Sequence, residues 1–145
     1  MLYSPRHLFL HHYKVPFVKP ISIAADLSCL ASRPVTGVGY YTRHLFEALL
    51  RQSPEVDLRV FACAARPLPE EVRAFGTKAT RFAGHRISTR LKNELWTRCE
   101  WPPLSWFLGD TDIVHGGFHL LPPSRTARRV VTIFDLAGMR RAAIH

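Results

Sequence analysis

Two closely spaced glycines stand where the main chain can approach a ligand. Gly37 and Gly39 lie in a predicted loop between the apolar run 21–26, which ends in Asp26, and the segment 41–50. A short apolar run closed by a carboxylate is typical of a buried parallel strand, and segment 41–50 has its apolar side chains on one helical face. A strand, a glycine loop and a helix form the unit that brings backbone N–H groups and a helix N-terminus to a phosphate.

Known nucleotide and nucleophile motifs do not fit this chain. A dinucleotide fingerprint needs a third glycine where Thr42 stands, and an acidic residue at the end of the second predicted strand, where Cys63 and Ala64 stand. Neither the Gly-Lys-Ser/Thr of a P-loop nor the Gly-x-Ser-x-Gly of a hydrolase occurs. The glycine loop is left either as a phosphate-approach loop or as an ordinary turn that needs a positive φ at glycine.

Other polar residues near strand ends are candidates for chemistry. His119, in a predicted loop after a strand, can serve as a hydrogen-bond partner or general base, or be a surface or capping histidine. Asp26 and Asp135 each close a predicted strand, where they can orient hydroxyl groups or cap the next helix; the residues alone favour capping. No metal site is expected, because the histidines near the N-terminus lack acidic or cysteine companions: His7, His11 and His12.

The charge balance is strongly basic, with 20 Lys+Arg against 11 Asp+Glu and a formal net charge of +9. Such an excess indicates an acidic partner (nucleic acid, an anionic membrane surface or a phosphorylated ligand), unless acidic residues in an absent part of the polypeptide balance it. The basic segment 81–108 contains Trp96, Trp101 and Trp106. It fits a membrane interface, a surface that stacks nucleic acid bases, or a solvated basic face whose tryptophans fill the core.

The cysteines and the hydrophobic runs indicate the cellular compartment of the protein. Cys29, Cys63 and Cys99 are an odd number with no C-x-x-C pair, so a reducing cytosol is expected rather than a disulfide framework or zinc ribbon. Residues 1–20 have no signal-peptide core, and no run is long enough to span a membrane. We interpret 1–20 as an irregular leader and 21–145 as one folded domain.

The order of the elements predicts the fold class. Apolar runs and helical faces alternate, and this alternation indicates an α/β protein with a doubly wound, mostly parallel sheet. The predicted strands are 21–26, 58–63, 80–82, 112–115 and 129–135; the predicted helices are 41–50, 70–75 and 88–100, the last with Leu91, Leu95 and Cys99 on one face. Ligands collect at the carboxyl ends of such strands. The residues expected to gather there are Asp26, Gly37, Gly39, His115, His119 and Asp135.

Three blocks resemble a known family. Thr36-Gly37-Val38-Gly39-Tyr40-Tyr41, Asp112-Ile113-Val114-His115 through Pro123, and Val130-Val131-Thr132-Ile133-Phe134-Asp135-Leu136 are similar, in order and spacing, to motifs of family 4 retaining glycosyltransferases with the GT-B fold. The resemblance implies a Rossmann-like N-terminal, acceptor-side domain, incomplete after Asp135. The missing C-terminal domain would carry most of the nucleotide-sugar pocket.

The resemblance also implies roles for individual residues. His119 and Asp135 would be the catalytic residues, with His119 facing the sugar and Asp135 shaping the acceptor side. The loop that faces the donor diphosphate would be Gly37, Val38, Gly39 and Tyr40. No metal and no cofactor is implied, because the nucleotide-sugar is itself a substrate. The chain departs from the family at three places: Phe134 replaces a histidine, Gly116-Gly117 replaces Ser-Pro, and Tyr40 replaces an arginine.

Together these features predict a cytoplasmic glycosyltransferase fragment. The whole enzyme would move a sugar from a nucleotide-sugar to a hydroxyl of a saccharide or lipid-linked acceptor, and the fragment alone would be inactive. Peripheral association with the inner membrane face fits the basic charge. The alternative is a non-catalytic basic module that binds a membrane surface or nucleic acid, with nucleic acid the less favoured partner.

Overall fold

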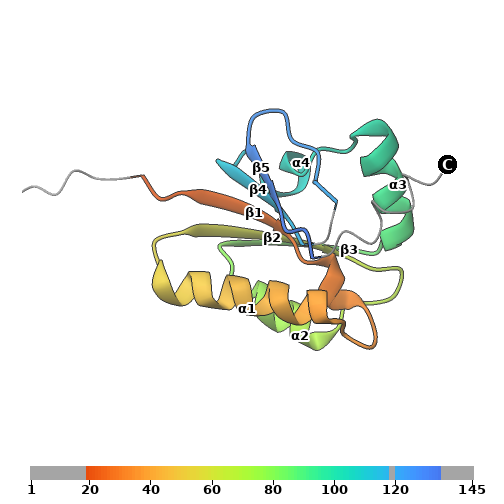
Figure 1. The fold of residues 1–145 in the computed structure, drawn as a ribbon, viewed down its shortest axis with the longest axis horizontal. Helices are drawn as coiled ribbons and strands as arrows, with labels where there is room; N and C mark the ends of the chain where they lie inside the picture. The colour runs from red at the N-terminus through yellow and green to blue at the C-terminus, as the bar shows by residue number, and fades with distance from the viewer. Residues whose placement is uncertain (1–18, 118–119, 135–145) are drawn as a thin grey trace, which may run out of the picture.

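The computed structural model describes residues 19–117 and 120–134, and it contains one five-stranded sheet (Figure 1). Every pairing is parallel, and the strand order is β3-β2-β1-β4-β5. The strands are β1 (Ser22–Asp26), β2 (Asp57–Cys63), β3 (Arg81–His85), β4 (Ile113–Gly116) and β5 (Arg128–Val131). The α/β fold class and the parallel, Rossmann-like sheet predicted from the sequence are confirmed.

Helices cover both faces of the sheet. In Figure 1, α1 and α2 lie below the strands, and α3 and α4 lie above them. The bounds are α1 (Gly37–Gln52), α2 (Glu70–Gly76), α3 (Thr89–Cys99) and α4 (Ser105–Leu108), and a short 3-10 helix, η1 (Ser28–Ala31), follows β1. No helix in the described part of the chain is both long and apolar enough to cross a membrane.

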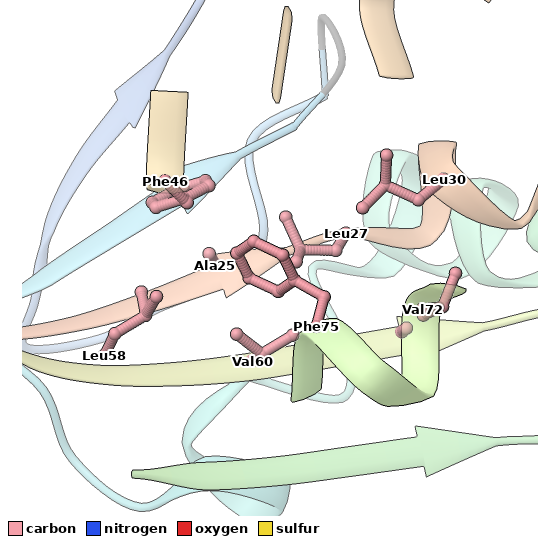
Figure 2. Close-up of a cluster of buried hydrophobic side chains, with 9 residues drawn as sticks. Ala25, Leu27, Leu30, Phe46, Leu58, Val60, Val72 and Phe75 are labelled. Atoms are coloured by element: carbon pink, nitrogen blue, oxygen red, sulfur yellow. The ribbon is translucent and has the colours of Figure 1, made fainter. Parts of the chain in front are cut away.

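Two apolar layers hold the helices to the sheet. Leu58 and Val60 of β2 point toward α1 and α2, where they pack with Phe46 and Phe75 (Figure 2). On the opposite face, Phe61 packs with a second cluster under α3 and α4; its other buried members are Ala24, Cys63, Trp96, Leu104, Leu108 and Val114. Burial on both faces explains why β2 is apolar at successive positions rather than at alternate ones. Each fully buried large apolar side chain contributes about 1.5–3 kcal/mol.

Strands β1 and β4 are joined at their amino ends by reciprocal hydrogen bonds between Ser22 and Asp112. The carboxylate of Asp112 accepts hydrogen bonds from the backbone N–H of Ser22 (2.9 Å) and from its hydroxyl (2.6 Å), and the Asp112 N–H donates to the Ser22 hydroxyl oxygen (3.0 Å). These two donors hold the pKa of Asp112 below its ordinary value. The link fixes the register of β1 against β4.

The glycine pair does not form a loop, contrary to the sequence-based prediction. Helix α1 begins at Gly37, with Thr36 as its N-cap, so both glycines belong to the first helical turn. A Cβ on Gly39 would lie 2.8 Å from Cγ1 of Val35, whereas a Cβ on Gly37 would meet nothing within 4 Å. Gly39 therefore lets the helix start close against the preceding segment.

Two further predictions from the sequence are corrected. The apolar side chains that indicated α3 are not the ones it buries: α3 turns Lys92 and Trp96 inward, while Leu91 is 53% exposed. The large indole ring of Trp96 packs 5.8 Å from Phe61, and an aromatic side chain buries more surface than a leucine. Strand β5 ends at Val131, short of the predicted 129–135. Residues 1–18 of the predicted leader lie outside the described residues.

Candidate functional site

A pocket with mostly polar lining residues lies at the carboxyl edge of the sheet, where the strand order reverses. The chain proceeds from β1 to β2 and β3 on one side, and then crosses over to β4 on the other side of β1. Helices that diverge from such a point leave a crevice, and in open α/β sheets ligands bind there. The pocket has a volume of about 210 Å³. Its lining consists of Asp26, Ser28, Cys29, Ser32, Thr36, Thr89, Lys92, Asn93, Gly117 and Leu120.

The floor of the pocket is a buried ion pair. Asp26, at the end of β1, accepts a hydrogen bond from the ammonium group of Lys92 on α3, and both residues are 7% exposed. The other carboxylate oxygen of Asp26 accepts from the Ser28 N–H (3.0 Å) and hydroxyl (2.5 Å). Asp26 thus binds the first residue of the 3-10 turn with one oxygen and the Lys92 ammonium group with the other.

The Lys92 ammonium group also contacts the Trp96 ring and the pocket. Its ammonium nitrogen lies 4.4 Å from the centroid of the Trp96 ring, a cation–π distance. The group lines the pocket, and an ammonium has more N–H donors than its bond to Asp26 uses. A buried, oriented cation beside a carboxylate can bind a hydroxyl, which both donates and accepts, or an anion.

The thiols near the floor are not suited to nucleophilic chemistry. Burial raises the pKa of Cys29, and the charge of Asp26 raises it further, although Thr42 and Lys92 act in the opposite sense. Burial also raises the pKa of Cys63, whose N–H donates to the Ser28 hydroxyl at 3.0 Å. Since the thiolate is the reactive form, both side chains act as neutral thiols at neutral pH.

The rim of the pocket is formed by the start of α1. Thr36 lines the pocket, and its side chain makes no capping hydrogen bond. The N–H of Tyr40 donates to the Thr36 carbonyl at 3.1 Å. This amide is therefore engaged within the helix, whereas the sequence predicts that it faces the ligand. The first-turn amides of Gly37, Val38 and Gly39 have no acceptor inside a helix. Gly37 is exposed beside the pocket, whereas Gly39 is buried.

The loop after β4 is pressed against the end of β1. A Cβ on Gly117 would lie 2.2 Å from the carbonyl oxygen of Asp26. The Gly117 carbonyl accepts a hydrogen bond from the Thr42 hydroxyl of α1 at 3.1 Å. This contact brings β1, α1 and the β4 loop together and closes one side of the pocket.

Among the described residues, His115 and Phe134 do not line the pocket. His115 on β4 is buried beside Phe46 (ring centroids 5.3 Å) and 3.4 Å from the Thr132 hydroxyl, and it does not join Asp26 as predicted. Burial lowers its pKa, and its Nδ1 has no partner among the described residues. Phe134 packs edge-on against Tyr41 at 5.2 Å. His119 and Asp135 lie outside the described residues, so their roles stay predictions.

Sequence reasoning missed most of the pocket. Ser28, Cys29, Thr89, Lys92 and Asn93 come from a 3-10 turn and a helix face that no motif marks. One signal was present: a carboxylate at the end of a buried strand needs a cation or hydrogen-bond donors. Lys92 precedes Trp96 by one helical turn, and a lysine in register with a buried tryptophan is a candidate for that partner.

The fold and the pocket define this chain as an α/β protein with a Rossmann-like parallel sheet and a candidate binding site at its switch point. No protein-family model, curated protein or solved structure matched the chain. Its function is therefore inferred from the pocket and from the sequence motifs.

Proposed function

We propose that the chain is the acceptor-side domain of a nucleotide-sugar-dependent glycosyltransferase, and that its pocket binds a sugar. The observation that carries the proposal is the pocket itself. It lies at the switch point of the sheet, its floor is the Asp26–Lys92 ion pair, and its rim is the N-terminus of α1. The sequence blocks that resemble family 4 retaining glycosyltransferases supply the reaction class.

The chemistry of the lining suits a polyhydroxylated ligand. Hydroxyl groups of Ser32, Thr36 and Thr89 and the amide of Asn93 surround the charged floor. Sugar hydroxyls donate and accept hydrogen bonds at once, so they pair with carboxylates, ammonium groups, amides and hydroxyls alike. The volume of about 210 Å³ is below that of a typical drug-sized site, so it fits one sugar ring rather than a whole nucleotide-sugar.

The start of α1 offers stabilisation to an anionic leaving group. Sugar transfer from a nucleotide-sugar releases a diphosphate, on which negative charge grows as the bond breaks. The free first-turn amides of Gly37 and Val38 and the positive end of the helix can share that charge. Gly37 is the residue that a phosphate can approach closely, because no atom stands where its Cβ would be.

A second domain completes the proposed enzyme. The resemblance places most of the nucleotide pocket, with its basic clamp, in such a domain. We therefore expect the 145-residue chain to bind saccharides and to transfer sugar negligibly by itself. A cytoplasmic location is part of the proposal, since all three cysteines are free thiols, as a reducing compartment keeps them.

The proposal is tested by titrating the isotope-labelled chain with mono- and disaccharides and with uridine- and guanosine-diphosphate sugars, followed by NMR. Amide shifts are expected at Thr36, Gly37, Thr89 and Asn93. Asn93→Ala should weaken binding about fivefold, the value of one hydrogen bond of about 1 kcal/mol. Arg51→Gln, on the exposed far end of α1, is the matched control.

Two results would contradict the proposal. Saccharides and nucleotide-sugars that leave the pocket amides unshifted would remove its basis, and robust sugar transfer by this chain alone would refute the division of labour between two domains. Salt-sensitive binding to polyanions, with no response to any nucleotide-sugar, would favour the alternative of a non-catalytic basic module.

A further inference from the structure

An apolar surface lies on the side of α3 that faces away from the sheet. We call it the tryptophan surface and define it as Leu91, Leu95, Trp101 and Trp106. Leu91 is 53% exposed, Trp101 49% and Trp106 66%, while Leu95 is half-buried. The third tryptophan, Trp96, is buried in the core. Large apolar side chains gathered at one place on a surface indicate an interaction site.

The members of the tryptophan surface are contiguous. Leu91 and Leu95 are one turn apart on α3, which is followed by its C-cap Glu100 in a left-handed conformation (φ 47°). The N–H of Trp101 then donates to the Leu95 carbonyl at 3.5 Å, which brings the chain back beside the helix end. The Trp101 and Trp106 rings meet edge to face, with centroids 5.6 Å apart. Helix end and following turn thus form one apolar ridge.

Basic side chains flank this ridge. Arg98 lies on the same side of α3 as the leucines, its side chain is 77% exposed, and it pairs with Glu94 at 2.8 Å. Arg90, next to Leu91, is also exposed. Arg129 of β5 forms an ion pair with Glu100, just after the end of the helix, at 3.4 Å. The arrangement combines exposed indoles and leucines with arginines on a chain of net charge +9.

We propose that the tryptophan surface binds an anionic lipid bilayer. Indole rings are amphipathic and settle at the level of lipid headgroups, leucines enter the acyl boundary, and arginines meet lipid phosphates. A stable protein partner would need roughly 1,200 Å² or more of total buried surface, which two leucines and two tryptophans on one short ridge do not offer. One helix face with aromatic anchors and basic flanks suffices for an interface with lipid.

This surface is separate from the pocket. Thr89, Lys92 and Asn93 line the pocket from α3, and none of them belongs to the tryptophan surface. Membrane binding therefore does not depend on the proposed transferase function, and either can fail alone. Helix α3 places the two sites on opposite sides.

The experiment is co-sedimentation of the full chain with vesicles of phosphatidylglycerol and phosphatidylcholine in equal amounts. The chain should sediment with these vesicles, less with pure phosphatidylcholine, and less in about 1 M NaCl, where surface charges are screened. Brominated lipids should quench the fluorescence of the wild-type chain, because bromine reaches Trp101 and Trp106 at the interface. Buried Trp96 accounts for the unquenched remainder.

Matched variants locate the binding surface. The double variant Trp101→Ser/Trp106→Ser should lower the partition constant about tenfold or more, by removing apolar area from the interface. Arg90→Gln and Arg98→Gln should each lower it about fivefold. Arg51→Gln, an exposed arginine on α1 across the sheet, and Ile133→Ser, at a 62% exposed apolar position, should leave it unchanged. Circular dichroism checks that each variant is folded.

Three outcomes would overturn the proposal. One is sedimentation with neutral vesicles as strong as with anionic ones. Another is an absence of quenching by brominated lipid in the wild-type chain. The third is a wild-type dimer that the tryptophan double variant converts to a monomer without loss of vesicle binding, which would make the surface an interface between copies of this chain.

Discussion

Lys92 and Asp26, 66 positions apart in the chain, form a buried ion pair that joins α3 to the carboxyl end of β1. The pair links the helix above the sheet to the strand at its centre, and it also forms the floor of the pocket. A buried charge without its partner is strongly unfavourable. The two side chains must therefore be considered together, in stability as well as in binding.

Removal of Lys92 is expected to be costly. Lys92→Met leaves the Asp26 carboxylate buried with only the Ser28 donors, and we expect a loss of about 3–5 kcal/mol in the free energy of unfolding. The double variant Asp26→Asn/Lys92→Met should recover most of this loss, because no buried charge is left. Urea denaturation of wild type and both variants measures the difference. A Lys92→Met chain as stable as the wild type would show that the pair is not buried as described.

The two glycines at the start of α1 should respond in opposite ways to alanine. Gly39→Ala places a Cβ 2.8 Å from Val35 Cγ1 and should destabilise the fold by about 1–3 kcal/mol. Gly37→Ala meets no atom within 4 Å and should be neutral, or should stabilise the helix by up to about 1 kcal/mol. Thermal unfolding of both variants checks the contrast, and equal effects would argue against the close approach at Gly39.

The loop after β4 should tolerate no side chain at Gly117. An alanine Cβ there would lie 2.2 Å from the backbone oxygen of Asp26, and neither backbone can move without disturbing the sheet edge. We expect a loss of about 3 kcal/mol or more from Gly117→Ala, at the upper end of what overpacking costs. Denaturant unfolding, with Gly37→Ala as the control for a glycine in open space, measures it. A loss below that of Gly39→Ala would contradict this geometry.

The fold was largely predictable from the sequence, and the pocket was not. The run Val130-Val131 and the apolar stretch Phe61-Ala62-Cys63 indicated strands because buried parallel strands are apolar without alternation. The start of α1 was missed because glycine is a poor helix former. Only the close approach of Val35 to Gly39 shows why a glycine stands at that position. Lys92 escaped notice because its partner, Asp26, lies 66 positions away, and the only local signal was its spacing of one helical turn from Trp96.

The free energy of unfolding should decrease as the pH falls below about 6.5, because of His115. Its ordinary pKa is 6.5, and burial lowers the pKa in the folded state. Below pH 6.5 the unfolded chain takes up the proton while the folded chain does not, so the free energy of unfolding decreases as pH falls toward the folded-state pKa. Above pH 6.5 both states are neutral and this contribution is constant.

The measurement is urea unfolding at several pH values from about pH 7.5 to about pH 5.5, for wild type and His115→Leu. The wild type should lose stability across this window, and the variant should show a smaller slope. The carboxyl groups with lowered pKa values, such as Glu47 and Asp57, titrate below their ordinary 4.5 and 3.8 and so do not interfere. A slope that His115→Leu leaves unchanged would assign the effect to another group.

The link between Ser22 and Asp112 spans 90 positions, and this has a consequence for how the protein is made. On the ribosome, β1, α1, β2, α2, β3 and α3 all emerge before β4 does. Until then the central strand has one edge whose N–H and C=O groups lack a mate, and such an edge can pair with another nascent chain. Sheet completion is consequently a late event of synthesis, and slow folding is expected of a protein whose middle strand is closed by so distant a neighbour.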